Sequence, residues 1–271
     1  MPSSSSKPSV LGLVAATVGG YLAGILASLL FGFLVMVLSW IGPRGRLTLW
    51  LCRVWARIIL FCSGVRVRAH FERPLPPEEN FVFLANHSSY FDIPALLVTI
   101  PNQMRFAAKR SLFSIPFFGW GLTAGGFIPI DRDDKSKARE SFQAAVERLK
   151  SGISVLFFPE GTRCNDGKLH PFERGGFLLA LKSGLPVVPV GIRGAREVFP
   201  RNRFWVSPGK VEIFFGTPIE TASLGVKGRA ALTAEVRSKI LALAEIEDAG
   251  ETGPERPGQG PAASEEAAGQ G

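Results

Sequence analysis

The chain has 271 residues, 46% of them apolar, which predicts one sizeable core and one folded domain. Charge is unevenly distributed: residues 243–271 hold seven acids and one base, whereas the other 242 residues hold 30 bases and 16 acids. The body of the protein is therefore basic and not acidic. This charge favours polyanionic partners, such as nucleic acid, anionic lipid or phosphorylated ligands.

The first element is an uncharged run of 36 positions, from Pro8 to Pro43. A membrane-spanning helix needs only about 20 apolar residues, so the run suffices for one tilted span or for two short helices forming a hairpin. Glycines 19, 20 and 24 mark either a break between two helices or a face for close packing. The apolar region of a signal peptide is only about 7–15 residues, which argues against one here. A buried helix of a soluble protein is the remaining alternative.

Basic residues flank this run mostly on its C-terminal side, with Arg44, Arg46, Arg53 and Arg57 after it and Lys7 before it. The positive-inside tendency therefore places the body of the protein in the cytoplasm. Residues 47–62 predict an amphipathic helix at the membrane interface, and a helix packed on the core is the alternative. The three cysteines have neither paired nor metal-ligand spacing, so reduced thiols are expected.

Short β-rich runs then alternate with helical patterns, which predicts an α/β fold with a mixed, mostly parallel sheet flanked by helices. An edge strand is expected at 65–71 and buried strands at 81–85, 126–130, 153–158, 187–191 and 211–215. Helices are expected at 135–150, 176–182 and 228–244. The composition after Gly250 predicts a disordered tail. The expected organisation is a membrane-anchoring segment with interfacial helices (1–62), a folded domain (63–249) and the tail (250–271).

The segment NHSSYFD, residues 86–92, directly follows the expected strand 81–85 and contains a histidine and a carboxylate. Imidazole is a suitable general base near neutral pH, provided that an acceptor holds its other nitrogen. On one ideal helix, His87 and Asp92 would lie about 140° apart, so the pair requires His87 in a turn and Asp92 at the start of a helix. Pro94 favours that arrangement. A loop histidine and a plain N-cap carboxylate are the alternatives.

Two further polar clusters end expected strands: Glu160-Gly161-Thr162-Arg163 follows 153–158, and Asp131-Arg132 follows 126–130. Ligands of open α/β sheets bind at the carboxyl ends of the strands, and arginine matches the bidentate geometry of phosphate. Each cluster has a simpler interpretation. Glu160 and Arg163 could form a weak surface pair, and the second cluster could be a solvated charged loop.

Four motifs stand in order along the chain: NHSSYFD (86–92), GFIPIDR (126–132), FPEGTR (158–163) and VVPVGI (187–192). Together they resemble the glycerolipid acyltransferase family, specifically the 1-acylglycerol-3-phosphate acyltransferases, over about residues 60 to 225. One stretch departs from the family pattern: where a lysine before glycine is usual, this chain has Phe172-Glu173-Arg174-Gly175.

The resemblance implies roles for the matching residues. His87 would deprotonate the acceptor hydroxyl for attack on the thioester of acyl-CoA or acyl-carrier protein, and Asp92 would orient His87. Glu160, Gly161, Thr162 and Arg163 would shape the lysophosphatidate site, with Arg163 and Arg132 on its phosphate. The family's direct transfer needs no cofactor and no metal. The implied enzyme would act at a membrane, on its cytoplasmic face.

Several alternatives remain. Residues 119–124 loosely fit a dinucleotide fingerprint, although Pro116 argues against the strand that should precede it. No Gly-x-Ser-x-Gly elbow and no nucleic-acid motif is present. Acylation of another lyso-lipid, such as lyso-ornithine lipid or lysophosphatidylethanolamine, and a non-catalytic lipid-binding protein stay open. The sequence indicates neither donor, acyl length nor oligomeric state.

Overall fold

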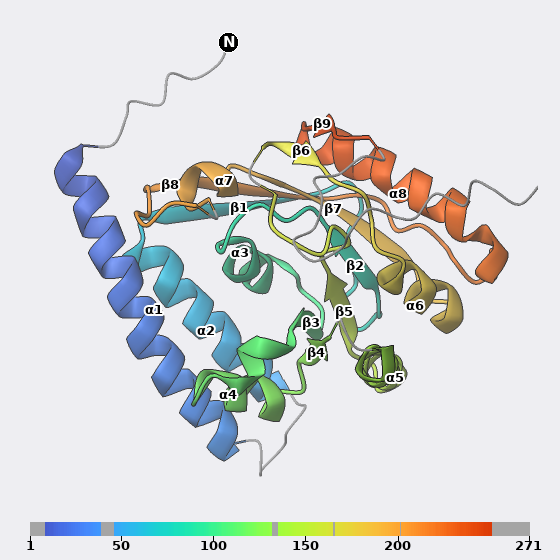
Figure 1. The fold of residues 1–271 in the computed structure, drawn as a ribbon, viewed down its shortest axis with the longest axis horizontal. Coiled ribbons are helices and arrows are strands. Elements are labelled where there is room, and N and C mark those ends of the chain that lie inside the picture. The colour runs from blue at the N-terminus through green and yellow to red at the C-terminus, as the bar shows by residue number, and fades with distance from the viewer. Residues whose placement is uncertain (1–8, 39–45, 132–134, 165, 201, 251–271) are drawn as a thin grey trace, which may run out of the picture.

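The computed structural model describes residues 9–38, 46–131, 135–164, 166–200 and 202–250 (Figure 1). Its main sheet has seven strands: β1 (Val65–Phe71), β2 (Val82–Ala85), β3 (Met104–Lys109), β4 (Ile128–Ile130), β5 (Ser154–Phe157), β7 (Val187–Arg193) and β8 (Gly209–Phe215). Arg132 and the expected tail after Gly250 lie outside the described residues.

The strand order is β1-β8-β7-β2-β5-β3-β4. Only β7 and β8 pair antiparallel, so the predicted mixed, mostly parallel sheet is confirmed, with β1 at one edge. A separate two-stranded sheet joins β6 (Lys168–Leu169) to β9 (Glu247–Asp248). The parallel strands β2, β5 and β7 end at the same edge, which is where both polar clusters begin.

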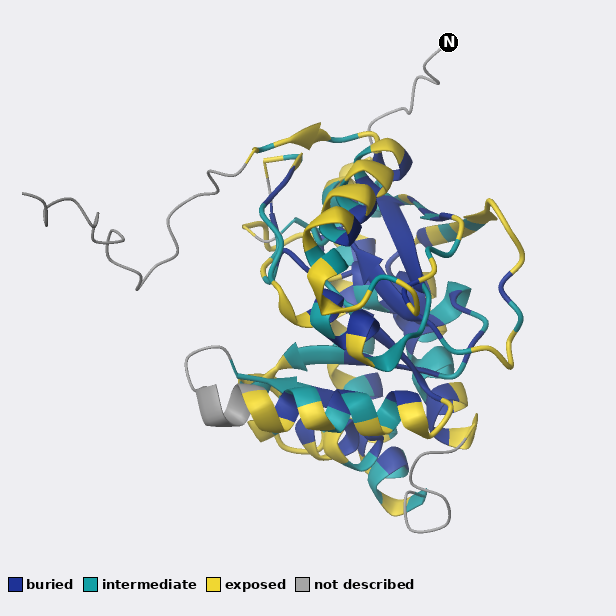
Figure 2. Cartoon of the chain, turned by 90° about the vertical axis from the view of Figure 1, so that its right-hand side faces the viewer, coloured by how far each residue is buried: buried dark blue, intermediate teal, exposed yellow. Residues whose placement is uncertain are grey.

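Helices cover both faces of the sheet (Figure 1). One layer holds α1 (Val10–Leu38), α2 (Arg46–Cys62), α3 (Asp92–Thr99) and α4 (Phe118–Ala124); the other holds α5 (Lys135–Lys150), α6 (Gly175–Ser183) and α8 (Arg229–Ala244). A short helix, α7 (Ala195–Val198), follows β7. Buried residues make up nearly all of the central strands β2, β5 and β7, and Figure 2 shows buried residues along strands that lie between the helices. This arrangement makes the loops at the strand ends the accessible part of the sheet.

The uncharged N-terminal run forms one continuous helix, α1, from residue 10 to residue 38. The alternative of two short helices within this segment is therefore wrong. Glycines 19 and 20 do not break the helix but allow close packing on the end of α2: a Cβ atom at Gly19 would lie 2.8 Å from the carbonyl oxygen of Cys62. By length and composition alone, α1 could cross a membrane.

Helix α2 forms as expected, but its inner side packs on the core through Leu49, Ala56 and Leu60. Arg53 does not extend toward an interface. Its Nη2 donates to the carbonyls of Ile100 (2.5 Å) and Pro101 (3.0 Å), just beyond the end of α3. In an amphipathic helix at the membrane interface, Arg53 would extend its charge toward the interface; that expectation is wrong for Arg53, because its guanidinium satisfies carbonyls at a helix C-terminus instead.

Strand β3 and helix α4 are among the elements that the sequence patterns did not predict. Strand β3 contains the fully buried Arg105, whose Nε donates to the Gly125 carbonyl at 2.5 Å, and this charge conceals the strand's apolar character. Helix α4 contains two glycines, Gly119 and Gly121, which disfavour helix. Packing against α1 supports this helix. Residues 119–124 lie within the helix and do not directly follow a strand, so the dinucleotide interpretation is wrong.

Candidate active site

The loop after β2 brings His87 and Asp92 together. The ring Nδ1 of His87 lies 2.7 Å from Asp92 Oδ2. A carboxylate can only accept, so the proton lies on Nδ1 and the lone pair on Nε2 is available to take a proton. Asp92 is fully buried, whereas the His87 side chain is 17% exposed. The geometry matches the pair that the sequence predicted.

Asp92 also shapes the loop that carries His87. It is the first residue of α3, directly after the N-cap residue Phe91, and its carboxylate points back toward the preceding turn. Asp92 Oδ2 accepts the backbone N–H groups of Ser88 (2.8 Å) and Ser89 (2.9 Å) in addition to the His87 ring. The carboxylate therefore does more than a plain N-cap, because it fixes both the turn and the imidazole.

The loop after β5 closes over the same histidine. The ring of Phe158 stacks on that of His87 with centroids 3.9 Å apart. The His87 backbone N–H donates to Glu160 Oε1 at 2.8 Å, and the Cys164 N–H donates to the His87 carbonyl at 2.9 Å. The two polar clusters, 73 residues apart, thus form one site.

Glu160 is buried, with 5% of its surface exposed. Its second oxygen accepts the His170 backbone N–H at 3.0 Å. Burial raises the pKa of Glu160 to about 7, and the hydrogen bonds from His170 and His87 offset this only in part. The alternative of a surface pair between Glu160 and Arg163 is wrong, because Glu160 bonds to backbone amides inside the protein.

Arg163 is the last residue of the FPEGTR motif (158–163). Its guanidinium carbon lies 3.5 Å from the ring centroid of Tyr90. Gly161 turns the chain between Glu160 and Arg163 with a φ of 78°, a conformation that favours glycine. Thr162 is exposed beside it. Of the predicted site residues, only Arg132 is not placed, since it lies outside the described residues.

Sequence reasoning assigned no role to Asn86, Tyr90 or His170. The buried Asn86 side chain exchanges two hydrogen bonds with the backbone of Ile192, at 3.1 and 2.7 Å, and so joins the end of β2 to β7. Tyr90 supports Arg163. Asn86 and Tyr90 stand within the NHSSYFD motif, which was the available signal, whereas nothing in the sequence linked His170 to Glu160.

A cavity of about 340 Å³ opens beside the pair, lined in part by His87, Ser88 and Glu160 and by Lys168, Arg193 and Arg196. Two of these cations are already matched: Arg193 pairs with Glu245 at 2.6 Å and Lys168 with Glu247 at 3.4 Å. Among the residues that the structure describes, no group of three or more His, Cys, Asp or Glu side chains could hold a metal ion.

The three-layer fold and the histidine–carboxylate pair at the strand ends define a protein of the acyltransferase class, and the family model described as Acyltransferase matches residues 66–193. A 1-acyl-sn-glycerol-3-phosphate acyltransferase of Pseudomonas aeruginosa is 32% identical over 203 residues, 74% of this chain and 75% of that protein. The chain belongs to this acyltransferase family, as its motifs predicted.

The crystal structure of the 1-acyl-sn-glycerophosphate (LPA) acyltransferase PlsC from Thermotoga maritima superposes with a TM-score of 0.71 at 26% identity, covering 86% of this chain and 96% of that one. A chloroplastic 1-acyl-sn-glycerol-3-phosphate acyltransferase of Arabidopsis thaliana is 31% identical over 80% of this chain. The chain spans only 61% of the length of that plant relative.

Proposed function

We propose that this protein is a membrane-bound O-acyltransferase that moves an acyl chain from acyl-CoA or acyl-carrier protein to the sn-2 hydroxyl of 1-acylglycerol-3-phosphate, forming phosphatidic acid. The observation that carries the proposal is the 2.7 Å contact between His87 Nδ1 and the buried Asp92 carboxylate, which leaves Nε2 available as a base. The names of the relatives support the choice of acceptor.

The chemistry requires few groups. His87 Nε2 takes the proton of the acceptor hydroxyl as its oxygen attacks the thioester carbonyl, and Asp92 stabilises the imidazolium that forms. The new C–O bond forms, the C–S bond breaks, and the departing thiolate takes the proton from His87. Because thiolate is a good leaving group, a base and correct positioning of both substrates suffice, without a covalent enzyme intermediate.

Arg163 is the candidate for the acceptor phosphate, aided by Arg132. Arg163 forms no ion pair with any residue that the structure describes, so its donors remain available to a ligand. The cavity cations Arg193 and Lys168 each face a glutamate. An arginine whose guanidinium carbon lies over an aromatic ring, as that of Arg163 does over Tyr90, can still present its N–H groups for bidentate phosphate binding.

Helix α1 is the proposed membrane attachment, with the active site on the cytoplasmic side. Its outer face exposes Leu22, Ile25 and Leu26, while its inner face packs on the body from Thr17, which bonds to Val206, to Ser28, which accepts from Trp55 Nε1. These contacts hold the acyltransferase domain against the helix. Retention of the protein in carbonate-washed membranes tests this attachment, and release into the soluble fraction would refute it.

The acyl-transfer proposal is tested by offering a panel of lyso-lipids to membranes that contain the protein, with the His87→Ala variant as the blank. Lysophosphatidate should be acylated fastest, from either acyl-CoA or acyl-carrier protein. Faster acylation of lyso-ornithine lipid or lysophosphatidylethanolamine would assign the same chemistry to another acceptor. Equal turnover by the wild type and His87→Ala with every acceptor would leave only a non-catalytic lipid-binding role.

A further inference from the structure

We propose that Glu160 is a positioning residue rather than a ligand of the acceptor: its carboxylate holds the backbone of His87 at one end and of His170 at the other, and Arg237 anchors the His170 end. This inference rests on the proposed acyltransferase function. It assigns a purpose to Glu160 and to the C-terminal strand β9 that neither the motifs nor the comparisons assign.

Both oxygens of Glu160 are occupied. Oε1 accepts the His87 N–H at 2.8 Å and Oε2 accepts the His170 N–H at 3.0 Å. Both donors belong to the main chain, so the carboxylate fixes where two loops begin, independently of their side-chain rotamers. In its ionised form, which predominates above about pH 7, Glu160 makes hydrogen bonds of the stronger, charge-assisted kind, and burial strengthens them further.

A direct role of Glu160 in phosphate binding conflicts with charge. A carboxylate next to a phosphate is repulsive, and with 5% of its surface exposed Glu160 offers little to a ligand. Arg163, three residues later, lies on Tyr90 and not on Glu160. Within this motif, Glu160 therefore bonds to the main chain inside the protein, and Arg163 lies against Tyr90.

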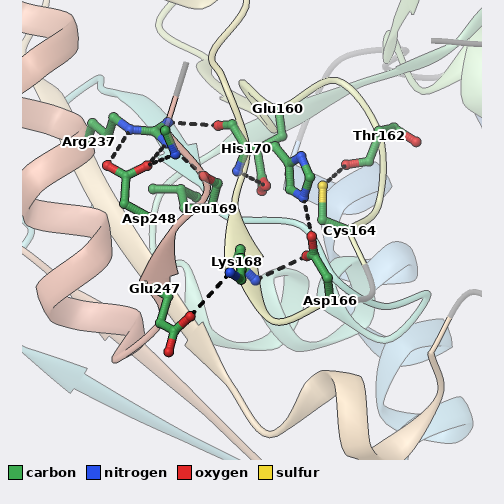
Figure 3. A network of polar contacts seen from close by, with 11 residues as sticks. Glu160, Thr162, Cys164, Asp166, Lys168, Leu169, His170, Arg237, Glu247 and Asp248 are labelled. Carbon is green, nitrogen blue, oxygen red and sulfur yellow. Dashed lines mark hydrogen bonds and ion pairs between the residues drawn. The ribbon is translucent and has the colours of Figure 1, made fainter. Parts of the chain in front are cut away.

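We call Glu160 with its two main-chain partners, the N–H groups of His87 and His170, the clamp. The C-terminal part of the chain anchors its His170 end (Figure 3). Arg237 of α8 donates to the carbonyls of His170 and Leu169, each at 2.7 Å. The same guanidinium donates from Nε to Asp248 of β9 at 3.0 Å. We call Arg237, Asp248 and the β6–β9 pair the C-terminal clasp.

The His170 ring completes this end of the network. Its Nε2 lies 2.8 Å from Asp166 Oδ2, on the loop that leads from Arg163 to β6 (Figure 3). The backbone of residue 170 is therefore fixed by Arg237 and its ring by Asp166. Glu160 thus bonds to a main-chain segment that the clasp holds in place, and the other end of the same carboxylate fixes His87.

The consequence lies in the placement of the base. Asp92 and Phe158 fix the plane of the imidazole, and Asp92 also holds the turn that follows at Ser88 and Ser89. The main chain of His87 itself is held by the second loop, at its N–H by Glu160 and at its carbonyl by the Cys164 N–H. A displacement of about 1 Å at a catalytic group can cost on the order of 100-fold in rate, so the clamp should govern turnover and not substrate binding.

The test compares Glu160→Gln and Arg237→Gln with matched controls on exposed positions of α8, Glu235→Gln and Lys239→Gln. A Gln side chain can accept one of the two N–H groups only, so Glu160→Gln should lower kcat about 10- to 100-fold with the KM of both substrates unchanged. Arg237→Gln should lower kcat less, by the same pattern. Both should speed amide hydrogen exchange in the peptides that contain His87 and His170, and neither control should.

A rise in acceptor KM with kcat retained in Glu160→Gln would overturn the proposal and make Glu160 a substrate ligand. Unchanged kcat and unchanged exchange would overturn it as well. Arg237→Gln acts from outside the cavity and guards against a Glu160→Gln protein that fails to fold. If the wild type transferred no acyl group, the proposed function would fail, yet the exchange experiment would still decide whether Glu160 clamps the two loops.

Discussion

Asp92 makes its hydrogen bonds within its own loop, residues 86–92, whereas Glu160, in the loop from Pro159 to Cys164, bonds to residues outside that loop. In the first, Asp92 receives three N–H groups from within five positions. In the second, Glu160 reaches His87 across 73 positions. His87 and Asp92, the proposed base and its orienting carboxylate, thus meet within a short segment, and the second loop helps to place them in the fold.

This difference separates two kinds of failure. Loss of the His87 ring should remove the chemistry while the fold survives, because the contact between this ring and Asp92 lies within five positions of the chain. Changes in the second should alter how the base and the acceptor are placed. The two loops can therefore be told apart by whether a substitution lowers kcat, raises KM or lowers stability.

The largest effect is expected for His87→Ala. Removal of a general base costs about 10²- to 10⁴-fold in kcat, and the acceptor KM should change little because the proposed phosphate ligand Arg163 remains. The control is His70→Ala, which removes a half-exposed histidine that pairs with Glu212. Steady-state kinetics on membranes would check this, and a similar loss in both variants would contradict the role of His87.

Asp92 offers a way to separate charge from hydrogen bonding within the first loop. Asp92→Asn keeps an acceptor for Ser88 and Ser89, so it should unfold like the wild type but lose about 100-fold in kcat, because no anion stabilises the imidazolium. Asp92→Ala also leaves these buried N–H groups without an acceptor and should lower the free energy of unfolding by about 2–4 kcal/mol. Thermal unfolding of both variants, beside the kinetics, would show whether the two losses separate.

The same local-versus-distant contrast explains how much of the protein the sequence could predict. The His87–Asp92 contact follows from a strand, a turn and a helix start, all visible in residues 81–94. The inward orientation of Glu160 depends on His170 and Arg237, which carry no motif and meet it only in the fold. Strand β3 escaped notice for a similar reason, because the buried charge of Arg105 is satisfied by the carbonyl of Gly125, beyond the strand.

The second loop is tested next at Arg163. Arg163→Ala should raise the acceptor KM about 10- to 100-fold and leave the donor KM unchanged, because hydrogen bonds to a charged phosphate are lost. Arg66→Ala, on exposed edge strand β1, is the control. Tyr90→Leu should raise the same KM only about 2- to 5-fold, by removing the ring beneath the guanidinium. An effect on donor KM instead would move Arg163 to the donor site.

A smaller effect concerns pH and stability. Burial raises the pKa of Glu160 to about 7, so between its usual carboxyl range and about pH 7 the native state holds more of this proton than the unfolded chain does. The contribution of Glu160 to the free energy of unfolding therefore falls as pH rises through this window, by at most about 1.4 kcal/mol per pH unit.

The difference in unfolding free energy between the wild type and Glu160→Gln, measured from pH 5 to 8, isolates this slope. The titratable groups around Glu160 are His87, Cys164, Asp166 and His170, and they are common to both proteins. The difference should decline up to about pH 7 and then level off. A difference that rises with pH would mean that ionisation of Glu160 stabilises the native state instead of destabilising it.

The smallest effect is expected at the C-terminus, where two truncations differ by four residues. A chain ending at Gly250 keeps Asp248 and its bond to Arg237 and should retain full activity, since it loses only the acidic tail. A chain ending at Ile246 also loses β9, which frees Arg237 from Asp248 and removes the bond from the Ala249 N–H to the Leu169 carbonyl. Its kcat should fall as in Arg237→Gln, with KM unchanged. Because both chains lose the tail, a difference between them belongs to the clasp, and equal activities would show that the second loop holds His87 without it.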